Sequence, residues 1–509
     1  METKTAAIEM RNITKRFGPV LANDKVWLNI YRGEILALLG ENGSGKTTLM
    51  NMLSGIYFPD EGEIKIDGKE VVIRSPKDAF DNGIGMIHQH FKLVDVLTAA
   101  ENIVLGLPGK LDLKAASAKI REICDKYGFS VDPAQKIYDM SVSQKQTVEI
   151  VKVLYRCADI LILDEPTAVL TPQETDKLFA VLRNMRNDGK AIVIITHKMH
   201  EVEALSDRVA ILRHGQFIGD MLTAHTNAQE MTNMMVGHAV SLNIERPDPV
   251  DPKPRIEVKG LTVRSVDGIV KLDDVSFTAN SGEILGIAGI SGCGQKELLE
   301  AIAGLQTVES GSISYIEDDG SREELIGKDP LSIAELGVSL SFVPEDRLGM
   351  GLVGNMNLAD NMMLRSFRRG KSIFTDRRSP RALAESVVQE LSVSTPSVDT
   401  PVRRLSGGNV QKVLVGREIA SAPTVLLTAY AVRGLDIHSS YTIYDLINRQ
   451  KKAGVAVIFV GEDLDVLLEL CDRILVLCGG KVSGIVSGRG AEKREVGMMM
   501  TKLGGQSHE

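Results

Sequence analysis

The chain has 509 residues and a formal net charge of −8 at pH 7. This length allows about three domains. The acidic balance argues against a chain-wide attraction for nucleic acid, because nucleic-acid-binding domains usually carry a basic face. Aromatic residues make up only 4% of the chain, which argues against a stacking platform for single-stranded nucleic acid. We therefore expect no nucleic acid among its partners.

Cysteine usage and hydropathy bear on the compartment. The five cysteines are scattered and show no C-x-x-C spacing, which favours reduced thiols in a cytosolic setting. No stretch offers the roughly eighteen uninterrupted apolar residues of a membrane-spanning helix, and the N-terminus lacks the hydrophobic core of a secretion signal. We expect a protein that is soluble, or is held at a membrane by other proteins.

The first elements in chain order are short strands. Residues 8–30 alternate between apolar and polar positions around a turn signal at Phe17-Gly18-Pro19, which predicts short alternating strands. The apolar run 35–39 predicts a buried strand, and residues 49–53 predict a helix. Further along, residues 62–68 carry a hairpin-like turn and strand signal.

A complete G-x-x-x-x-G-K-[ST] motif lies between the strand at 35–39 and the helix at 49–53, which is the context that a phosphate-binding loop requires. Its glycines let backbone N–H groups approach phosphates, Lys46 reaches the outer phosphates, and the hydroxyl of Thr47 suits Mg²⁺. The alternative is a chance glycine-rich turn before a helix. The predicted ATP-binding residues of the loop are Gly40, Glu41, Asn42, Gly43, Ser44, Gly45, Lys46, Thr47 and Thr48.

Later in the same half, residues 111–127 show helical periodicity. The apolar runs 160–163 and 191–195 predict two more strands, which end in Asp164-Glu165 and Thr196-His197. Buried strands that end in polar residues are typical of the active edge of a parallel α/β sheet.

The second half repeats this plan. Residues 33–36 recur at 282–285, and residues 207–209 recur with one substitution at 472–474. The sequence predicts two similar domains, residues 1–244 and 255–509. Residues 245–254 between them are rich in proline and predict an extended, rather stiff linker.

Taken together, these motifs resemble the ATP-binding subunits of ABC transporters, and in particular the tandem type that energises import of simple sugars and nucleosides. The resemblance also rests on Gln89 in Ile87-His88-Gln89-His90 and on residues 405–409, which match the family's signature loop except that Asn409 replaces the usual Gln. It implies an α/β fold with two P-loop NTPase domains in tandem, each with a parallel-sheet core, an antiparallel β subdomain and a helical subdomain.

The resemblance assigns roles to single residues. Asp164, Thr47 and Gln89 would surround Mg²⁺, Glu165 would polarise the attacking water, and His197 would hold the terminal phosphate. Glu165, His197 and Gln89 are thus the candidate catalytic residues. The alternatives are a helix-capping role for Glu165 and a structural role for His197.

The remaining contacts of the predicted site concern the two ends of the nucleotide. Phe17 lies where the family places an aromatic ring under the adenine, although an aromatic there is also compatible with a core position. In this family each nucleotide lies between the phosphate loop of one domain and the signature loop of the other. The predicted ATP contacts from the second domain are therefore Ser406, Gly407 and Gly408.

The second copy lacks the residues that hydrolysis needs. A glutamine cannot supply a cation, an alanine has no oxygen for Mg²⁺, and a phenol with a pKa of about 10 is a poor base. Lys46, Thr47, Asp164, Glu165 and His197 are matched there by Gln295, Lys296, Ala429, Tyr430 and Glu462.

The first copy's signature is altered as well. Val142 and Ser143 replace its glycines, and Thr171 stands where the second copy keeps Asp436. We therefore expect one hydrolytic and one degenerate composite site, with ATP and Mg²⁺ as cofactors; the alternative is unconstrained drift of the second copy.

The expected function is an importer ATPase on the cytoplasmic face of the cell membrane. It would be a peripheral subunit docked on two integral membrane permeases and would serve an extracytoplasmic solute-binding protein indirectly. Residues 90–102 resemble the region that seats a permease helix, with Phe91 and Leu93 either exposed for contact or part of the core. Glu345 holds the corresponding place in the second copy.

The cargo is the least constrained prediction. Residues 89–91 and 294–298, with Ala429, look closer to purine-nucleoside importers than to importers of monosaccharides such as ribose or galactose. A soluble tandem ATPase acting on the ribosome has the same layout, but it resembles two intact sites joined by a long, charged, helical linker. Binding without hydrolysis is opposed by the acid pair Asp164-Glu165. An exporter is disfavoured because exporters commonly fuse membrane helices to the ATPase.

Overall fold

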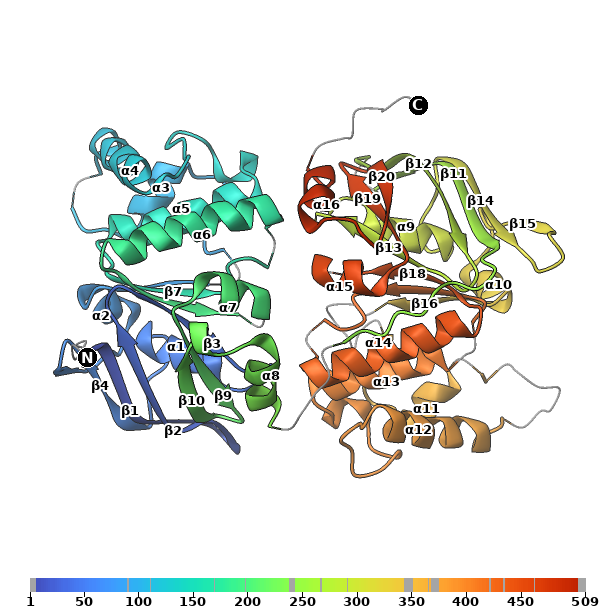
Figure 1. Ribbon diagram of the computed structural model, residues 1–509, viewed down its shortest axis with the longest axis horizontal. Coiled ribbons are helices and arrows are strands. Elements are labelled where there is room, and N and C mark those ends of the chain that lie inside the picture. The colour runs from blue at the N-terminus through green and yellow to red at the C-terminus, as the bar shows by residue number, and fades with distance from the viewer. Residues whose placement is uncertain are drawn as a thin grey trace. The chain divides into compact units, whose positions relative to one another are not determined.

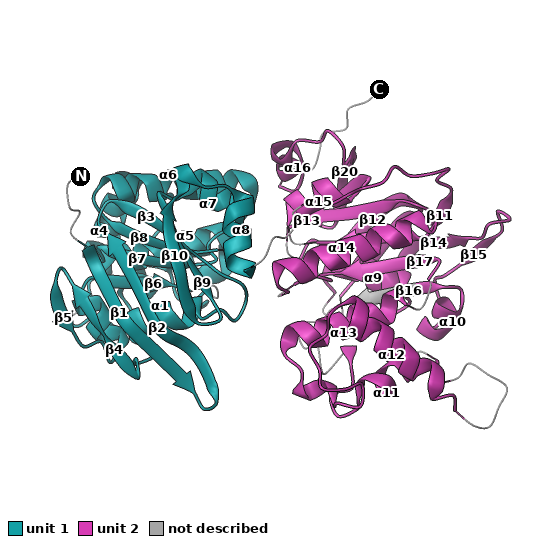
Figure 2. Cartoon of the chain, turned by 60° about the horizontal axis from the view of Figure 1, so that its bottom comes forward, with its two compact units in different colours: residues 1–241 teal, residues 242–509 magenta. Residues whose placement is uncertain are grey.

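The computed structural model divides into two compact units, Met1–Ser241 and Leu242–Glu509, which Figure 2 shows in separate colours. Each unit contains one six-stranded and one four-stranded sheet. The residues that the structure describes are 6–88, 91–109, 111–168, 170–196, 198–237, 243–265, 268–290, 292–342, 351–364, 366–367, 375–420, 423–433, 435–461 and 463–501.

The large sheet of the first unit has the strand order β10-β9-β3-β8-β7-β6. Neighbours from β9 to β6 pair in parallel, and β10 pairs antiparallel with β9. Its strands are β3 (Glu34–Leu39), β6 (Ile84–Ile87), β7 (Ile160–Asp164), β8 (Ala191–Ile195), β9 (Arg208–Arg213) and β10 (Gln216–Leu222). Every residue of β3, β7 and β8 is buried. This confirms the three strands predicted from uninterrupted apolar runs, which a sheet covered on both faces requires.

The second sheet of this unit is antiparallel, with the order β2-β1-β4-β5. Its strands are β1 (Ala6–Phe17), β2 (Val20–Tyr31), β4 (Glu61–Ile66) and β5 (Lys69–Val71). The short strands predicted for residues 8–30 are in fact two strands of 12 residues each. Breaks in their apolar alternation are register shifts, accompanied by left-handed backbone at Asn12 and Lys25, rather than strand ends.

Helices complete the first unit (Figure 1). Helix α1 packs against both sheets in one hydrophobic cluster, in which Leu49 and Met52 lie with Met10 and Leu36. Helices α3, α4 and α5 enclose a separate cluster of their own, so the helical subdomain is confirmed. The helices are α1 (Lys46–Leu53), α2 (Pro76–Asp81), α3 (Ala99–Val104), α4 (Leu113–Tyr127), α5 (Val142–Tyr155), α6 (Pro172–Asn187), α7 (Met199–Leu205) and α8 (Ala228–Val236), with 3₁₀ turns η1 (Ile137–Asp139) and η2 (Thr223–His225).

The second unit repeats the same two sheets, in the orders β16-β17-β18-β13-β19-β20 and β12-β11-β14-β15. The strands are β11 (Pro254–Arg264), β12 (Val270–Asn280), β13 (Ile284–Gly289), β14 (Ser310–Ile316), β15 (Arg322–Glu324), β16 (Val338–Phe342), β17 (Val425–Ala429), β18 (Ala456–Val460), β19 (Arg473–Cys478) and β20 (Lys481–Ser487). The helices are α9 (Gln295–Ile302), α10 (Pro330–Glu335), α11 (Leu358–Met363), α12 (Arg378–Glu390), α13 (Gly407–Ile419), α14 (Ile437–Lys452), α15 (Leu464–Leu470) and α16 (Lys493–Met499), with the 3₁₀ turn η4 (Val402–Arg404). The duplication and the predicted fold class are confirmed. Over the described ranges, the structure has no helix that is both long and apolar enough to cross a bilayer.

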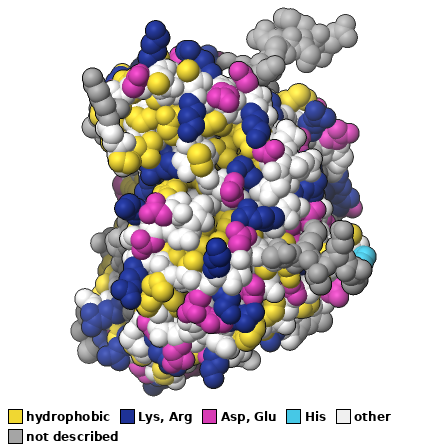
Figure 3. Space-filling model, turned by 90° about the vertical axis from the view of Figure 1, so that its left-hand side faces the viewer, with side chains coloured by type: hydrophobic (Ala, Val, Ile, Leu, Met, Phe, Trp, Pro, Cys, Tyr) yellow, Lys and Arg dark blue, Asp and Glu magenta, His cyan; other side chains and the backbone are white. Residues whose placement is uncertain are grey.

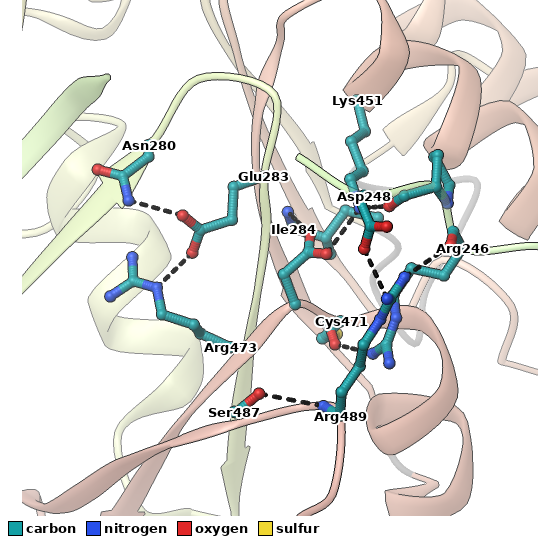
Figure 4. A network of polar contacts seen from close by, with 12 residues as sticks. Arg246, Asp248, Asn280, Glu283, Ile284, Lys451, Cys471, Arg473, Ser487 and Arg489 are labelled. Atoms are coloured by element: carbon teal, nitrogen blue, oxygen red, sulfur yellow. Dashed lines mark hydrogen bonds and ion pairs between the residues drawn. The ribbon is translucent and has the colours of Figure 1, made fainter. Parts of the chain in front are cut away.

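The proline-rich segment at 245–254 is bound to the second unit (Figure 4). Arg246 donates to the carbonyl oxygens of Leu468, at 3.0 Å, and of Cys471. Just before it, Ile244 is buried within the core of this unit. The segment predicted as a stiff linker is thus extended along one unit and hydrogen-bonded to it.

A buried lysine also holds this segment in place. Lys451, at the end of α14, is almost completely buried and donates to the carbonyl oxygen of Pro247 and to Asp472, 2.7 Å away. Asp248 forms an ion pair of 2.6 Å with Arg489. Because a buried ammonium needs partners, the carbonyl oxygen of Pro247 is a structural part of the second unit.

Replacing Arg246 with alanine is expected to lower the unfolding free energy of the second unit by about 1–2 kcal/mol, because two carbonyl oxygens lose a charged donor. The chain's one tryptophan, Trp27, lies in the first unit. Urea unfolding followed by circular dichroism should show an earlier transition for the variant, while the transition seen by Trp27 fluorescence stays in place. Lys253→Ala, which removes an exposed side chain of the same segment, should change neither.

Candidate functional site

The predicted phosphate loop joins β3 to α1 in a conformation that only glycines allow. Gly43 and Gly45 have φ angles of 82° and 94°, a region that side-chain-bearing residues rarely adopt. A Cβ on Gly45 would lie 2.3 Å from the carbonyl oxygen of Ala22, and one on Gly40 would lie 2.3 Å from that of Leu212. Among the described residues no side chain caps α1, so its first N–H groups remain available to an anion.

Lys46 is folded onto this loop. Its ammonium donates to the carbonyl oxygens of Gly40 and Glu41, at 2.6 and 2.9 Å, and the residue is only 8% exposed. Burial lowers the pKa of Lys46, against the opposing attraction of Glu165 and Asp164. A buried cation within a glycine cradle fits a polyphosphate, whose negative charge would offset the cost of burial.

Asp164 ends β7 beside Thr47. The Thr47 hydroxyl donates to the Asp164 carboxylate at 3.2 Å, as expected if both face one cation. Burial raises the pKa of Asp164 to about 6, and the nearby Glu165 adds to the rise, whereas the Thr47 hydrogen bond and Lys46 oppose it. A hydroxyl and a carboxylate oxygen are ligands that Mg²⁺ prefers. When bound, the metal would neutralise charge on the phosphate oxygens.

Glu165 occupies a turn that breaks away from the strand. Its φ angle is 50°, and its N–H donates to the carbonyl oxygen of Ile195 at the end of β8, 2.9 Å away. Tyr430 in the second unit has a φ angle of 55° and donates to Val460 at 3.0 Å. The two residues therefore hold equivalent positions, as the alignment of the repeats predicts. Because the left-handed turn occurs in both units, it is a feature of the shared fold.

Phe17 lies at the hairpin between β1 and β2 and is 42% exposed. Because of this exposure, Phe17 is not a core residue. Its ring contacts that of Tyr57 edge to face, with the ring centroids 5.1 Å apart. The following part of β2 touches the phosphate loop, since the Asn23 amide donates to the carbonyl oxygen of Gly45 at 3.3 Å. An exposed Phe17 ring beside Tyr57 is compatible with the predicted contact with adenine. Tyr57 was missed from the sequence, although it follows α1 in an aromatic Tyr57-Phe58 pair.

Several predicted residues lie outside the described residues. They are Gln89, His197, Glu345 and Glu462. Of the segment after Gln89, Phe91 is partly buried, and Leu93 packs against the core of the helical subdomain. Val94 and Val96 are exposed instead. The exposed apolar side chains of this segment are therefore ones that the sequence analysis did not single out.

The predicted signature residues lie at the start of α13 in the second unit. Ser406 caps this helix and is exposed. The Asn409 amide donates to the Ser406 hydroxyl at 2.9 Å and accepts from the Ser394 N–H at 3.0 Å, so the shorter side chain still supports the serine. A Cβ on Gly408 would meet only a Leu435 methyl group at 3.8 Å. Nothing described in this unit requires glycine there.

The first unit's equivalent loop forms the same cap with different side chains. Ser141 caps α5 through a reciprocal pair of hydrogen bonds with Gln144. Val142 follows and is 37% exposed, where the second unit has Gly407. The local helix start is preserved in both units, whereas its outer surface carries a bulky side chain in only one.

The second unit keeps the shape of the phosphate loop without its chemistry. Gly294 precedes α9 with a φ angle of 99°, as Gly45 precedes α1. Gln295 is buried in place of Lys46 and donates to the carbonyl oxygen of Ile290 at 3.2 Å. Lys296 forms an ion pair with Glu300 at 3.6 Å on the same helix. An uncharged amide replaces the cation, so this loop has lost its main attraction for phosphate.

Thr171 and Asp436 both cap helices. Thr171 caps α6 together with Glu174, and Asp436 caps α14 through the N–H and hydroxyl of Ser439, at 2.7 and 2.6 Å. Burial would raise the pKa of Asp436, but these hydrogen bonds to its carboxylate lower it overall. Each residue thus has a role within its own unit.

A buried carboxylate that was not predicted lies on α7. Glu201 on α7 is 4% exposed and accepts hydrogen bonds from the hydroxyls of Thr167 and Thr196. A sequence signal existed, because Glu201 comes four residues after His197 in the chain and interrupts the apolar side of α7.

Comparison with known proteins points to one family. A family profile described as "ABC transporter" matches residues 23–168 and 272–428. The nucleoside import ATP-binding protein NupA of Lactococcus lactis is 42% identical, and the alignment covers 99% of each chain. The glucose import ATP-binding protein TsgD13 of Haloferax volcanii is 39% identical over 98% of this chain and 96% of its own. The guanosine import ATP-binding protein NupO of Bacillus subtilis is 40% identical over 97% of each chain.

The pKa of Asp164 predicts a pH dependence of stability. Folding raises this pKa from 3.8 to about 6, so the folded protein binds more protons than the unfolded chain between these values. Its unfolding free energy therefore falls as pH rises through that interval. Asp164→Asn is expected to raise the unfolding free energy by up to about 3 kcal/mol at about pH 7.5, and by much less at about pH 4.5.

Urea titrations followed by Trp27 fluorescence, without nucleotide or Mg²⁺, measure this difference in the first unit. Asp125→Asn, at an exposed position of α4, is the control and should show no such pH-dependent gain. A loss of stability in Asp164→Asn at both pH values would contradict the assignment.

Proposed function

The chain belongs to the ABC transporter family of ATP-binding proteins, and from that premise we propose that it hydrolyses ATP to drive the import of a nucleoside or simple sugar, with a purine nucleoside favoured. The observation that carries the proposal is the pair of buried charged groups, Lys46 and Asp164, at the glycine loop of the first unit, with the exposed Thr47 hydrogen-bonded to Asp164. Phosphoryl transfer depends on positioning and charge stabilisation, and these residues supply both.

The catalytic roles are those that the resemblance to the family implies. Lys46 and the N–H groups of α1 bind the phosphates, and Thr47 and Asp164, with Gln89, hold Mg²⁺. Glu165 orients and polarises the attacking water, and His197 contacts the terminal phosphate. Glu165 directly follows Asp164 at the end of β7 and lies close enough to raise the pKa of that carboxyl, which supports a role beside the metal.

The hydrolytic site is completed by the second unit. In this proposal Ser406, Gly407 and Gly408 close over the nucleotide held by Lys46. The support is steric: an added side chain at Gly408 has room within its own unit, so a close external approach explains the glycine. The opposite site combines Gln295 and Ala429 with Val142, and all of these substitutions weaken phosphate binding. That site acts structurally, whether or not nucleotide occupies it.

The coupling to transport is assigned to membrane permeases, two in number, with a solute-binding protein outside the membrane. The chain then works as a peripheral subunit on the cytoplasmic face. Exposed apolar side chains of the helical subdomain support a docking surface; they are Val94, Val96, Leu105, Leu107 and Leu111. Figure 3 shows hydrophobic side chains interspersed with charged ones on one face of the first unit.

A purine nucleoside is the favoured cargo. Two relatives with 42% and 40% identity are named for nucleoside and guanosine import, and this agrees with residues 294–298 and Ala429. A monosaccharide is the second candidate, since a relative of similar identity is named for glucose import. Action on the ribosome is disfavoured, because the connecting segment is short, rich in proline and bound to one unit.

ATP turnover and uptake of labelled guanosine or ribose, in vesicles that contain the chain and its permeases, test the function. Lys46→Ala is expected to lower turnover by about 10²–10³-fold through loss of a phosphate-binding cation, and Glu165→Gln by about 10²–10⁴-fold through loss of the base. Tyr430→Phe, at the position equivalent to Glu165, should leave turnover within about two-fold of the unaltered protein. Loss of activity in Tyr430→Phe would contradict the asymmetry of the sites.

A pair of exchanged residues tests the composite site. Gly407→Val places in the second unit the side chain that the first unit carries as Val142, where the same helix start tolerates it. Turnover is expected to fall by about 10²-fold, because the side chain separates the loop from the phosphates. Val142→Gly should leave turnover unchanged. Equal activity in Gly407→Val and the unaltered protein would place the signature of the second unit outside the hydrolytic site.

A further inference from the structure

Glu201 connects two strand ends of the first unit. Its carboxylate accepts hydrogen bonds from the Thr167 hydroxyl at 2.6 Å and the Thr196 hydroxyl at 3.3 Å. The Lys198 ammonium lies 3.2 Å from the same carboxylate and 3.4 Å from the carbonyl oxygen of Thr167. All of these groups except Lys198 are almost completely buried. The cluster is satisfied within the protein, as a buried charge requires.

The two threonines lie just beyond the strand ends on which the proposed chemistry depends. Thr167 follows Asp164 and Glu165 at the end of β7, and Thr196 directly precedes His197 at the end of β8. The two strands are parallel neighbours, and Asp164 pairs with Ile195. Glu201 therefore joins the turn that carries the acids to the end of β8.

The second unit is an internal control for the cost of folding. It has Val432, Gly461 and Val466 in place of Thr167, Thr196 and Glu201. Its strands β17 and β18 still pair in the same register, and α15 still follows. The N–H of Tyr430 reaches the carbonyl oxygen of Val460 just as that of Glu165 reaches Ile195. The fold thus forms without the carboxylate.

The two units also differ in the free-energy cost of the buried side chain at this position. Burying a carboxylate costs free energy that hydrogen bonds and a nearby lysine offset only in part. An apolar replacement such as the second unit's valine avoids that cost. The charged cluster occurs in the unit that also has Lys46, Asp164 and Glu165, and is absent from the unit that lacks their counterparts.

We propose that Glu201 is a positioning residue for ATP hydrolysis, which holds the Glu165 turn and the end of β8 in one fixed relation through Thr167 and Thr196. It acts through these hydroxyls and makes no contact with nucleotide. The inference rests on the proposed function, since it assumes hydrolysis in the first unit. Its predicted effect is on the rate of the chemical step and not on ATP binding, because the phosphate loop has its own contacts.

The test replaces the cluster with the residues of the second unit. Thr167→Val, Thr196→Gly and Glu201→Val are combined, so that no hydroxyl is left without its partner, and Glu201→Val and Glu201→Gln are made singly. In the complex with permeases, kcat is expected to fall by about 10²-fold in the triple variant and in Glu201→Val. The dissociation constant of a fluorescent ATP analogue should stay within about three-fold.

Conservative rescue distinguishes positioning from bulk structure. An amide of the same shape keeps hydrogen bonds to both threonines, so kcat of Glu201→Gln should stay within about three-fold of the unaltered protein. Val466→Ala, at the equivalent position of the second unit, is the matched control and should leave kcat unchanged. Glu201→Gln as slow as Glu201→Val would overturn the hydrogen-bonded connection, and parallel loss of kcat and ATP affinity would show a merely structural role.

The two proposals fail separately. Equal turnover in the unaltered protein and Lys46→Ala would remove the proposed function itself. Normal turnover in the unaltered protein, together with a triple variant within about three-fold of it, would leave the function standing and refute the role of Glu201.

Discussion

A lysine ammonium and an aspartate carboxyl are both buried at one edge of the first unit's parallel sheet, and burial opposes the charge of each. Burial lowers the pKa of Lys46 and raises the pKa of Asp164, so neither group is there for the benefit of folding alone. The attraction between these two opposite charges offsets part of the cost of burying them, and Thr47 on α1 adds a hydrogen bond to Asp164 at the end of β7. This interaction is the one on which the rest of the site depends. The loop glycines, the turn at Glu165 and the cluster around Glu201 all hold this charged edge in shape.

The two units allow the fold and the chemistry to be separated. Both units have the same strand order. Both also have a left-handed turn after β7 or β17 and a glycine directly before α1 or α9. Only one unit has the cation, the acids and the buried Glu201. The retained backbone features therefore belong to the fold, whereas the residues that differ belong to the proposed chemistry.

Much of this was predictable from sequence, for physical reasons. Buried parallel strands must be uninterrupted apolar runs, so β3, β7 and β8 were identified, and the phosphate loop was recognised because its glycines serve one conformation. The register shifts of β1 and β2 were not predictable, since a break in alternation looks like a strand end. Phe17 contacts Tyr57, and Glu201 accepts a hydrogen bond from Thr167; these partners are far apart in the chain, so the sequence alone did not indicate them. Gln89 and His197, which lie outside the described residues, remain predictions.

In the segment between the repeats, the start of the second sequence repeat differs from the start of the second folded unit. By sequence similarity the second copy begins near residue 255, yet its folded body already includes Ile244, Arg246 and Pro247. A fragment cut at the start of the repeat would expose the core beside Ile244 and leave the ammonium of Lys451 short of an acceptor. The natural boundary for dissecting this chain therefore lies upstream of its proline-rich stretch, because the second unit needs this segment to cover its core and to satisfy Lys451.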